Sequence, residues 1–514
     1  MRNFILKIRA TPRQTLFLWS LLLAVFGTGI AFRSLWLANI PGINGDEAWY
    51  GAQLRDLPHF TWHTPSGNIV DPFHMLPLAL SQFLFPSGFL ALRLPSLLSG
   101  LLLIGLGWLI FRKSLSPTVA LIFALLVAGS PDLIAYSRFG WDASHTGLAT
   151  LFVMYFMLNR QWALLLLAQI CAVVIHPTNI FLVAIWGPYL LYQVLQVIRA
   201  KGISVNKTWI AFPLVLVLMS IFLLTRIQIG QLVASFGPHL LSLFKPKDLL
   251  SLLGGFVELL DGTTVYRYII GPVSATTNFF HLIFVVIVIV PVVIYGNLKL
   301  IRRKDFRGLI FLAGIPLAII ALYLVSGIRP FQPSAERYSQ FLMIPTIILV
   351  AISLEAVVDG TSRQPSSAVY LALMIAGLGL LSFWVNYFTP VFSTGGQSQM
   401  AFRTAPVEPK QQVADILIND GMLTGRAHIL AEDYWLAMPL RYLFANQHHL
   451  WIDIPTAPRG IVQALTNHAY VVGFSGMYFQ KYISAQDLPF KLETWVITDY
   501  ANKPLIIIWH RPAP

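Results

Sequence analysis

The run LFLWSLLLAVFGTGIAFRSLWL (16–37) is predominantly apolar, and Asn44-Gly45-Asp46-Glu47-Ala48-Trp49-Tyr50 follows it closely. About 20 apolar residues are enough to cross a bilayer as a helix. Two adjacent carboxylates, Asp46 and Glu47, are therefore expected just beyond a membrane edge. Acids are costly near hydrocarbon, so an acidic pair in this place predicts a functional site. The alternative interpretation is a solvated loop start or a helix cap.

The composition indicates a polytopic membrane protein. Of the 514 residues, 56% are hydrophobic and 11% are charged, and the mean hydropathy is +0.68. The basic N-terminus resembles a signal peptide, but its apolar run is longer than a signal core, which predicts a retained signal anchor. The single cysteine, Cys171, lies in an apolar stretch, so we expect neither a disulfide framework nor a cysteine-based metal site.

Apolar segments predict about eleven membrane-spanning helices. They lie at 16–37, 93–111, 117–136, 146–158, 161–175, 178–198, 208–225, 277–296, 308–326, 338–357 and 367–388. A further segment, 72–90, is interrupted by Pro72, Pro77 and Pro86, and we expect it to be interfacial or re-entrant.

Basic residues decide the expected orientation, because short cytoplasmic loops retain Lys and Arg. With 72–90 not spanning, one set of helix ends holds Arg2–Arg13, Arg112, Lys113, Arg160, Arg199, Lys201, Lys207, Lys299–Arg307 and Arg363. This distribution predicts a cytoplasmic N-terminus, a first external loop at 38–92, and an external C-terminus. We expect a plasma (inner) membrane protein whose active site faces the periplasm or the exterior.

The composition changes near residue 390. Residues 408–419 and 433–444 are predicted as helices, and 427–431, 449–454, 470–474, 495–498 and 505–509 as strands. The expected fold is thus mainly α: a transmembrane helical bundle at 1–389, followed by a soluble α/β domain at 390–514 on the outer face. Nothing in the second domain indicates catalysis.

The predicted orientation collects acids, bases and guanidinium groups at one face. These are Asp46, Glu47, Asp71, His74, Arg93, Arg138, Asp142, His176, Arg267, Arg329, Glu336, Arg337 and Tyr338. Carboxylates can act as general bases or metal ligands. Arginine can bind phosphate in a bidentate way that lysine cannot. The set suits a substrate with a lipid tail, a phosphate at the headgroup level and a polar group beyond.

Five motifs in order resemble the GT-C glycosyltransferases, closest to the protein O-mannosyltransferase/aminoarabinose-transferase (family 39-like) branch. They are Asp46-Glu47-Ala48-Trp49-Tyr50-Gly51-Ala52-Gln53, Asp71-Pro72-Phe73-His74-Met75-Leu76-Pro77-Leu78, Ala91-Leu92-Arg93-Leu94-Pro95-Ser96, Ser137-Arg138-Phe139-Gly140-Trp141-Asp142, and Glu336-Arg337-Tyr338 followed by Pro345. The second departs from the pattern, since Met75-Leu76 stands where a proline is usual. The motifs cover about 300 residues and do not specify the sugar or the acceptor.

The resemblance implies an inverting transfer of a sugar from a polyprenyl-phosphate carrier to an acceptor on the outer face. Asp46 is the expected general base, and Glu47 supports the site or a helix end, because neighbouring helical residues point about 100° apart. Asp142 is expected as a second acid near the acceptor, or as a helix cap. Arg337 and Tyr338 are the expected binders of the donor phosphate.

The remaining predicted substrate-binding residues have ordinary alternatives. Arg93, Arg138, Arg267 and Arg329 are secondary candidates, and each is equally explained as an interfacial arginine. His74 and His176, beside prolines, line the cavity or contact lipid headgroups.

The expected partners are a polyprenyl-phosphate sugar, membrane lipid and a glycan, lipid or protein acceptor, with no nucleic acid. The sequence assigns no certain cofactor and no metal ligand, although adjacent carboxylates permit a divalent ion. Alternatives from other classes are a polytopic transporter and an envelope ligase, polymerase or phosphotransferase. A transporter would place ionisable groups near the bilayer midplane and often shows a repeat between halves, and the sequence displays neither feature.

Overall fold

The computed structural model describes residues 12–57, 60–65, 67, 69–85, 88–201, 240, 242–243, 245–271, 285–326, 335–358, 366–394, 407–419, 427–445, 447, 450–455 and 457–512. The predictions made for Arg329, for the segment 208–225 and for the first part of 277–296 lie outside these residues.

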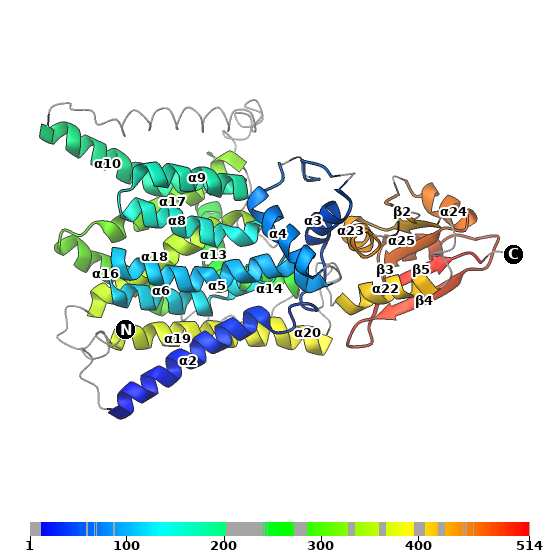
Figure 1. Cartoon of the computed structure of the whole chain (residues 1–514), viewed down its shortest axis with the longest axis horizontal. Coiled ribbons are helices and arrows are strands. Elements are labelled where there is room, and N and C mark those ends of the chain that lie inside the picture. Colours follow the sequence, from blue (N-terminus) through cyan, green and yellow to red (C-terminus); the bar gives the residue numbers. More distant parts are fainter. Residues whose placement is uncertain are drawn as a thin grey trace.

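A bundle of apolar helices makes up one end of the molecule (Figure 1). Its helices are α2 (Pro12–Ser34), α5 (Phe89–Ser114), α6 (Pro117–Gly129), α7 (Pro131–Tyr136), α8 (Thr146–Leu158), α9 (Trp162–Ile175), α10 (Val183–Lys201), α13 (Pro246–Leu260), α14 (Thr263–Ile269), α16 (Val290–Arg302), α17 (Arg307–Ser326), α18 (Met343–Val358), α19 (Ser366–Phe383) and α20 (Thr389–Thr394). Tighter 3-10 turns form η2 (Asp142–His145), η3 (Pro177–Leu182) and η5 (Glu336–Leu342), and wider π turns form η4 (Val285–Ile289) and η6 (Trp384–Phe388).

Five stretches of the described residues are long and apolar enough to cross a membrane. They are Leu16–Ser34, Phe89–Ser114, Arg307–Val325, Glu336–Val358 and Ser367–Ser393, and shorter apolar helices lie at Pro117–Gly129, Trp162–Ile175 and Pro177–Leu191. The protein is therefore a multi-pass membrane protein by its helices. The expected total of about eleven crossings stays a prediction.

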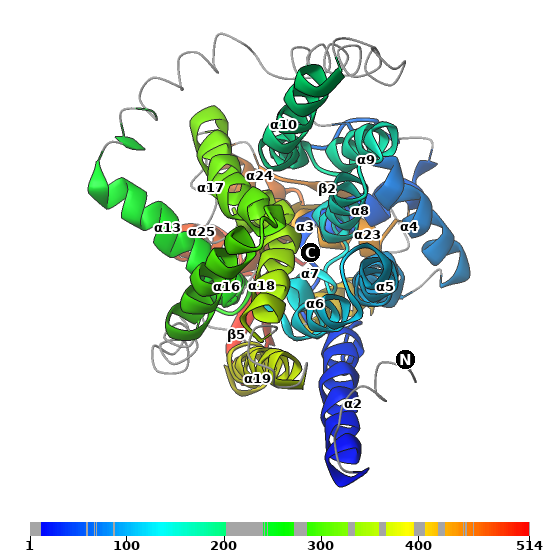
Figure 2. The ribbon, with the colours of Figure 1, turned by 90° about the vertical axis from the view of Figure 1, so that its left-hand side faces the viewer.

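The centre of the bundle is α6, which packs against α5, α18 and α19 (Figure 2). A close backbone approach makes the α6–α19 contact possible: a Cβ on Gly129 would lie 2.5 Å from the Cα of Ala376. Small residues at such crossings let membrane helices come together with full van der Waals contact.

Two short helices lie between the bundle and the C-terminal end of the molecule: α3 (Gly45–Arg55) and α4 (Pro72–Leu84) (Figure 1). Asp71 caps α4 by accepting a hydrogen bond from the backbone N–H of Phe73 at 2.8 Å. With 13 residues α4 is only about 20 Å long, too short to cross hydrocarbon unaided. This length is in keeping with the interfacial position expected for 72–90.

The described C-terminal residues, 407–512, form a five-stranded sheet with helices on both faces, called here the C-terminal region. Its elements are α22 (Val407–Asn419), β1 (Ala427–Ala431), α23 (Tyr434–Leu443), β2 (Leu450–Asp453), α24 (Arg459–Thr466), β3 (Tyr470–Phe474), α25 (Tyr478–Ser484), β4 (Glu493–Thr498) and β5 (Pro504–His510). The strand order is β2-β1-β3-β5-β4, with β2, β1 and β3 parallel and β5 and β4 antiparallel to their neighbours.

Alternation along the strands builds two cores, one on each face of the sheet. Ile429, Val472 and Ile506 face α22 and α23, whereas Leu430, Val471 and Ile507 face α24 and α25. The five strands and the helices α22 and α23 confirm the elements expected from the sequence, whereas α24 and α25 were not predicted. One helix begins a residue later than predicted, at Tyr434, because the Asp433 side chain accepts from the Trp435 and Leu436 N–H groups and so caps the helix from outside.

The first of these cores continues beyond the C-terminal region. It also contains Ile43, Ala48 and Trp49 from α3 and the residues just before it, and Leu92 of α5. Helix α23 packs directly against α3. The segment that carries Asp46 and Glu47 therefore lies between the membrane bundle and the sheet (Figure 1).

Candidate functional site

Helix α3 begins with a capping box, which fixes the direction of both acids. The Asn44 side chain accepts from the Glu47 N–H at 3.0 Å, and the Glu47 carboxylate accepts from the Asn44 N–H at 3.2 Å. This pairing satisfies two of the donors that a helix start leaves open. Glu47 thus points back along the helix into the protein. Asp46, the preceding residue, points to a more exposed side of the helix.

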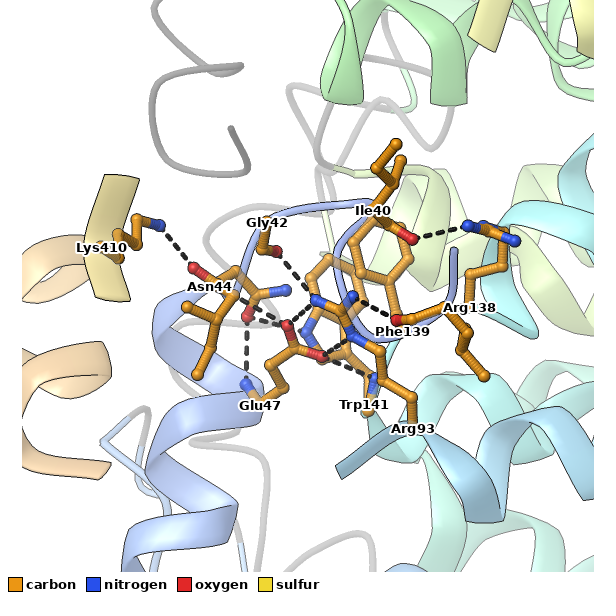
Figure 3. Close-up of polar contacts among 12 residues, drawn as sticks. Ile40, Gly42, Asn44, Glu47, Arg93, Arg138, Phe139, Trp141 and Lys410 are labelled. Carbon is orange, nitrogen blue, oxygen red and sulfur yellow. Dashed lines mark hydrogen bonds and ion pairs between the residues drawn. The ribbon is translucent and has the colours of Figure 1, made fainter. Parts of the chain in front are cut away.

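The Glu47 carboxylate is fully buried and paired with Arg93 (Figure 3). Arg93 Nη2 lies 2.6 Å from Oε1, its Nε lies 3.1 Å from Oε2, and the Gly140 N–H donates to Oε2 at 3.0 Å. Arg93 also donates to the carbonyls of Leu37 and Gly42, at 2.8 and 3.0 Å. One buried ion pair therefore connects α5, α3 and the loop before α3.

Two more buried cations hold that loop by its carbonyl groups (Figure 3). Arg138 donates to the carbonyls of Phe32 (2.5 Å), Leu35 (2.8 Å) and Ile40 (2.6 Å). Lys410 of α22 donates to the carbonyl of Ile43. Burial lowers the pKa of Lys410 to about 7. The segment before α3 is thus held on one side by the bundle and on the other by the C-terminal region.

Asp46 lies on the more open side of α3. Its side chain is 30% exposed, and its Oδ2 lies 3.1 Å from Nη1 of Arg337, which is 33% exposed. The Tyr434 hydroxyl donates to Oδ1 at 3.3 Å. Arg337 also donates to the Tyr338 hydroxyl at 3.1 Å. One carboxylate is therefore held by a guanidinium from the bundle and by a phenol from the C-terminal region.

A second carboxylate stands close to the first. Asp142, at the start of η2, accepts from its own neighbour Ala143 N–H at 2.7 Å and from the Tyr50 hydroxyl. Burial raises the pKa of Asp142, and it also raises the pKa of Asp46. The pKa of Asp46 is further raised by the negative charge of Asp142 and lowered by Arg337 and Tyr434. Both acids are therefore stronger bases than ordinary aspartates.

The histidines and the third acid surround this pair. His176 packs its ring 5.7 Å from that of Tyr338, and His74 Nδ1 lies 3.0 Å from His145 Nε2. Burial lowers the pKa of His145 to about 4, so the ring is neutral at physiological pH. Burial raises the pKa of Asp71 to about 8, and the Asp142 charge adds to that shift.

The structure brings together Asp46, Asp142, His176, Arg337 and Tyr338 from the predicted set, with His74 beside Tyr50. It places Glu47, Arg93 and Arg138 in the buried contacts behind them. Arg267 instead forms an exposed ion pair with Glu258 at 2.8 Å.

Tyr434 and Lys410 were not predicted as site residues, because their neighbours in space are more than 350 positions away in the chain. It also gave no role to Tyr50 or His145. Tyr50 could have been predicted as a site residue, since it follows Asp46 by four positions and shares its helix face. Among the described residues, no group of three or more His, Cys, Asp or Glu side chains could hold a metal ion.

Three solved structures are similar to this chain. The apo structure of ArnT from Cupriavidus metallidurans aligns with a TM-score of 0.53 and 15% identity, covering 96% of this chain and 97% of that one. ArnT bound to undecaprenyl phosphate gives 0.49 and 14%, covering 97% and 98%. The Archaeoglobus fulgidus oligosaccharyltransferase in its apo form gives 0.48 and 14%, covering 89% and 69%.

No family model matches the sequence. No curated protein matches it either. At 15% identity, the likeness to apo ArnT concerns the fold, and it extends over nearly the whole of both chains. The predicted fold, a bundle of apolar helices followed by a C-terminal α/β region, is therefore confirmed, and apo ArnT shares it.

Proposed function

We propose that this protein is a membrane glycosyltransferase that moves a sugar, hexose or pentose, from a polyprenyl-phosphate donor to an acceptor hydroxyl, with inversion at the anomeric carbon. Asp46 carries the proposal. It is a partly exposed carboxylate of raised pKa, and it lies in contact with a partly exposed arginine on a fold shared with ArnT. A base and a phosphate-binding cation side by side are what such a transfer requires.

The reaction would proceed by one displacement. The acceptor oxygen attacks the anomeric carbon, its proton passes to Asp46 Oδ2, and the bond to the phosphate oxygen breaks with its electrons leaving on the phosphate. Arg337 stabilises the charge that develops on that phosphate. Tyr338, whose hydroxyl accepts from Arg337, keeps the guanidinium oriented.

Donor binding would also prepare the base. In the ligand-free structure Arg337 pairs with Asp46, and this contact lowers the pKa of the carboxyl. When a phosphate takes over part of the guanidinium, Asp46 loses that stabilisation and becomes the stronger base. Asp142 supports the same change, because its negative charge disfavours ionisation of Asp46.

We place this site, and a soluble domain at 390–514, on the periplasmic or extracellular side. Helix α5 begins beside α3 and ends at Arg112 and Lys113, at the opposite end of the bundle (Figure 1). The basic cluster of Lys299 and Arg302 closes α16 at that same end. Basic residues at one set of helix ends are typical of a cytoplasmic face.

The test uses membranes that contain the full-length protein and radiolabelled polyprenyl-phosphate hexoses and pentoses. Wild type should transfer label to endogenous acceptor, and Asp46→Asn should lower the rate by about 10²- to 10⁴-fold, the usual contribution of a general base. Asp487→Asn, at an exposed acid far along the chain, serves as the matched control. Label transfer no greater than in membranes lacking the protein would refute the function, and undiminished transfer by Asp46→Asn would refute the role of the base.

A further inference from the structure

The C-terminal region contacts α3 and the loop before it at two places, one on each side of Asp46. Before α3, the Asn39 amide donates to Glu408 Oε1 at 2.6 Å, and Lys410 donates to the Ile43 carbonyl. At the last residue of α3, Arg55 donates to the Tyr442 hydroxyl at 2.9 Å, and its guanidinium carbon lies 3.9 Å from the centre of the tyrosine ring. These contacts hold α22 against the loop before α3 and α23 against α3 itself.

Between these two places, Tyr434 reaches the acid itself. It is the first residue of α23, directly after the capping residue Asp433, and its ring lies against Gly45. A Cβ on Gly45 would come within 2.5 Å of the Tyr434 ring, so the absence of a side chain there lets the phenol approach. Its hydroxyl then donates to Asp46 Oδ1, on the oxygen that Arg337 does not hold.

We infer that Tyr434 is a positioning residue, which keeps the Asp46 carboxylate aimed at the acceptor while Arg337 exchanges its contact with Asp46 for the donor phosphate. The inference rests on the proposed function. Two opposed partners hold Asp46 in the ligand-free state, one on each oxygen. If one leaves for the phosphate, the other is the tether that remains, and a base must lie within hydrogen-bond reach of its proton.

Electrostatics fits this role. The titratable groups that face Asp46 are Arg337 from η5, Asp142 from η2, Tyr434 from α23 and Tyr50 from α3 itself. Burial and the charge of Asp46 hold the pKa of Tyr434 well above its usual value, so the phenol stays protonated and donates. A hydrogen bond to the ionised form favours that form. Tyr434 thus opposes the burial that raises the pKa of Asp46.

The experiment compares wild type, Tyr434→Phe and Tyr442→Phe in the full-length protein. Tyr442 makes a good control, because it lies in the same helix interface and also donates and accepts there, but it contacts Arg55 and Gly88 instead of Asp46. Two quantities are measured against pH: the rate of label transfer, and the carbodiimide labelling of Asp46, which modifies the protonated carboxyl and is quantified by peptide mass spectrometry.

Tyr434→Phe should raise the labelling midpoint of Asp46 by about one pH unit, the size expected for losing one hydrogen bond to a charged group. The acid limb of the transfer rate should move up with it, and the rate at its plateau should fall several-fold. Tyr442→Phe should leave both midpoints in place. An unchanged Asp46 midpoint in Tyr434→Phe overturns the inference. The labelling needs no turnover, so a protein that transfers no sugar would refute the proposed function while leaving this result interpretable.

Discussion

The two acids that open α3 are neighbours in the chain, yet they lie in opposite environments. Glu47 is fully buried, and both of its oxygens are bonded to protein groups of the bundle and the loop. Asp46 is 30% exposed and has two partners, each from a different part of the molecule. The difference follows from the helix geometry, since adjacent side chains point about 100° apart.

This comparison suggests a structural role for the Glu47–Arg93 pair and a catalytic role for the Asp46–Arg337 pair. Removing one partner of a fully buried ion pair leaves the other charge buried and unpaired, which strongly destabilises the protein. Such a pair therefore holds the segments that it joins in place. A partly exposed pair contributes less to stability, because water screens it and can replace either partner. Arg93 and Arg337 make the same kind of contact, and we expect only Arg337 to leave its acid at little cost in stability.

The largest expected effect is on stability. Arg93→Met leaves Glu47 buried without its cation and should destabilise the protein by about 3–5 kcal/mol. Arg337→Met should change stability by no more than about 1 kcal/mol. Thermal unfolding of the detergent-solubilised protein measures both. The double variant Glu47→Leu/Arg93→Met should recover part of the loss, since it removes both charges. Equal destabilisation by Arg93→Met and Arg337→Met would contradict the distinction between the two faces.

The next effect concerns catalysis at the open face. Arg337→Gln should lower the rate of sugar transfer by about 10²- to 10³-fold, the range for losing one donor to a developing charge. Arg337→Lys keeps the charge but not the forked geometry, so it should retain more activity than Gln and less than wild type. A rate assay at saturating donor separates these variants. If Lys and Gln were equally impaired, geometry rather than charge would be the essential contribution of Arg337.

Local patterns were enough to predict much of this molecule. The strands 427–431 and 470–474 were predicted to the residue, because a short, mainly apolar run with polar residues near its ends can be recognised in a short window. The grouping of Asp46 with Arg337 came from the predicted orientation of the helices and from the resemblance, not from any short window. Nothing local indicates that Tyr434 meets Asp46, since that contact depends on how the sheet docks onto α3. For the same reason the partner of Arg93 could not be predicted from its own segment.

A smaller effect tests the coupling of the two open carboxylates. The charge of Asp142 raises the pKa of Asp46, so Asp142→Asn should lower it. As the proposed base, Asp46 must be ionised, so the rate falls as the pH drops through the pKa of Asp46. In the variant, the acid limb of the rate profile should therefore move to lower pH. The pH profile of transfer, compared with wild type, checks the direction. A limb that moves upward would mean that Asp142 stabilises the ionised Asp46 through some other group.

The last effect concerns Asp71, which is almost as buried as Glu47 but caps α4 through Oδ1 instead of pairing with an arginine as Glu47 does. Burial raises its pKa to about 8 in the folded protein, against about 3.9 when unfolded. Between these values the folded state holds a proton that the unfolded state has released, so this residue's contribution to stability decreases as pH rises from about 4 to about 8. Asp71→Asn keeps the Oδ1 acceptor and cannot ionise. Its melting temperature should match wild type near pH 4 and exceed it by a growing margin up to pH 8. A difference that stays constant over this range would mean that Asp71 is ionised in the folded protein, and that a buried carboxylate here is stabilised without the arginine that Glu47 requires.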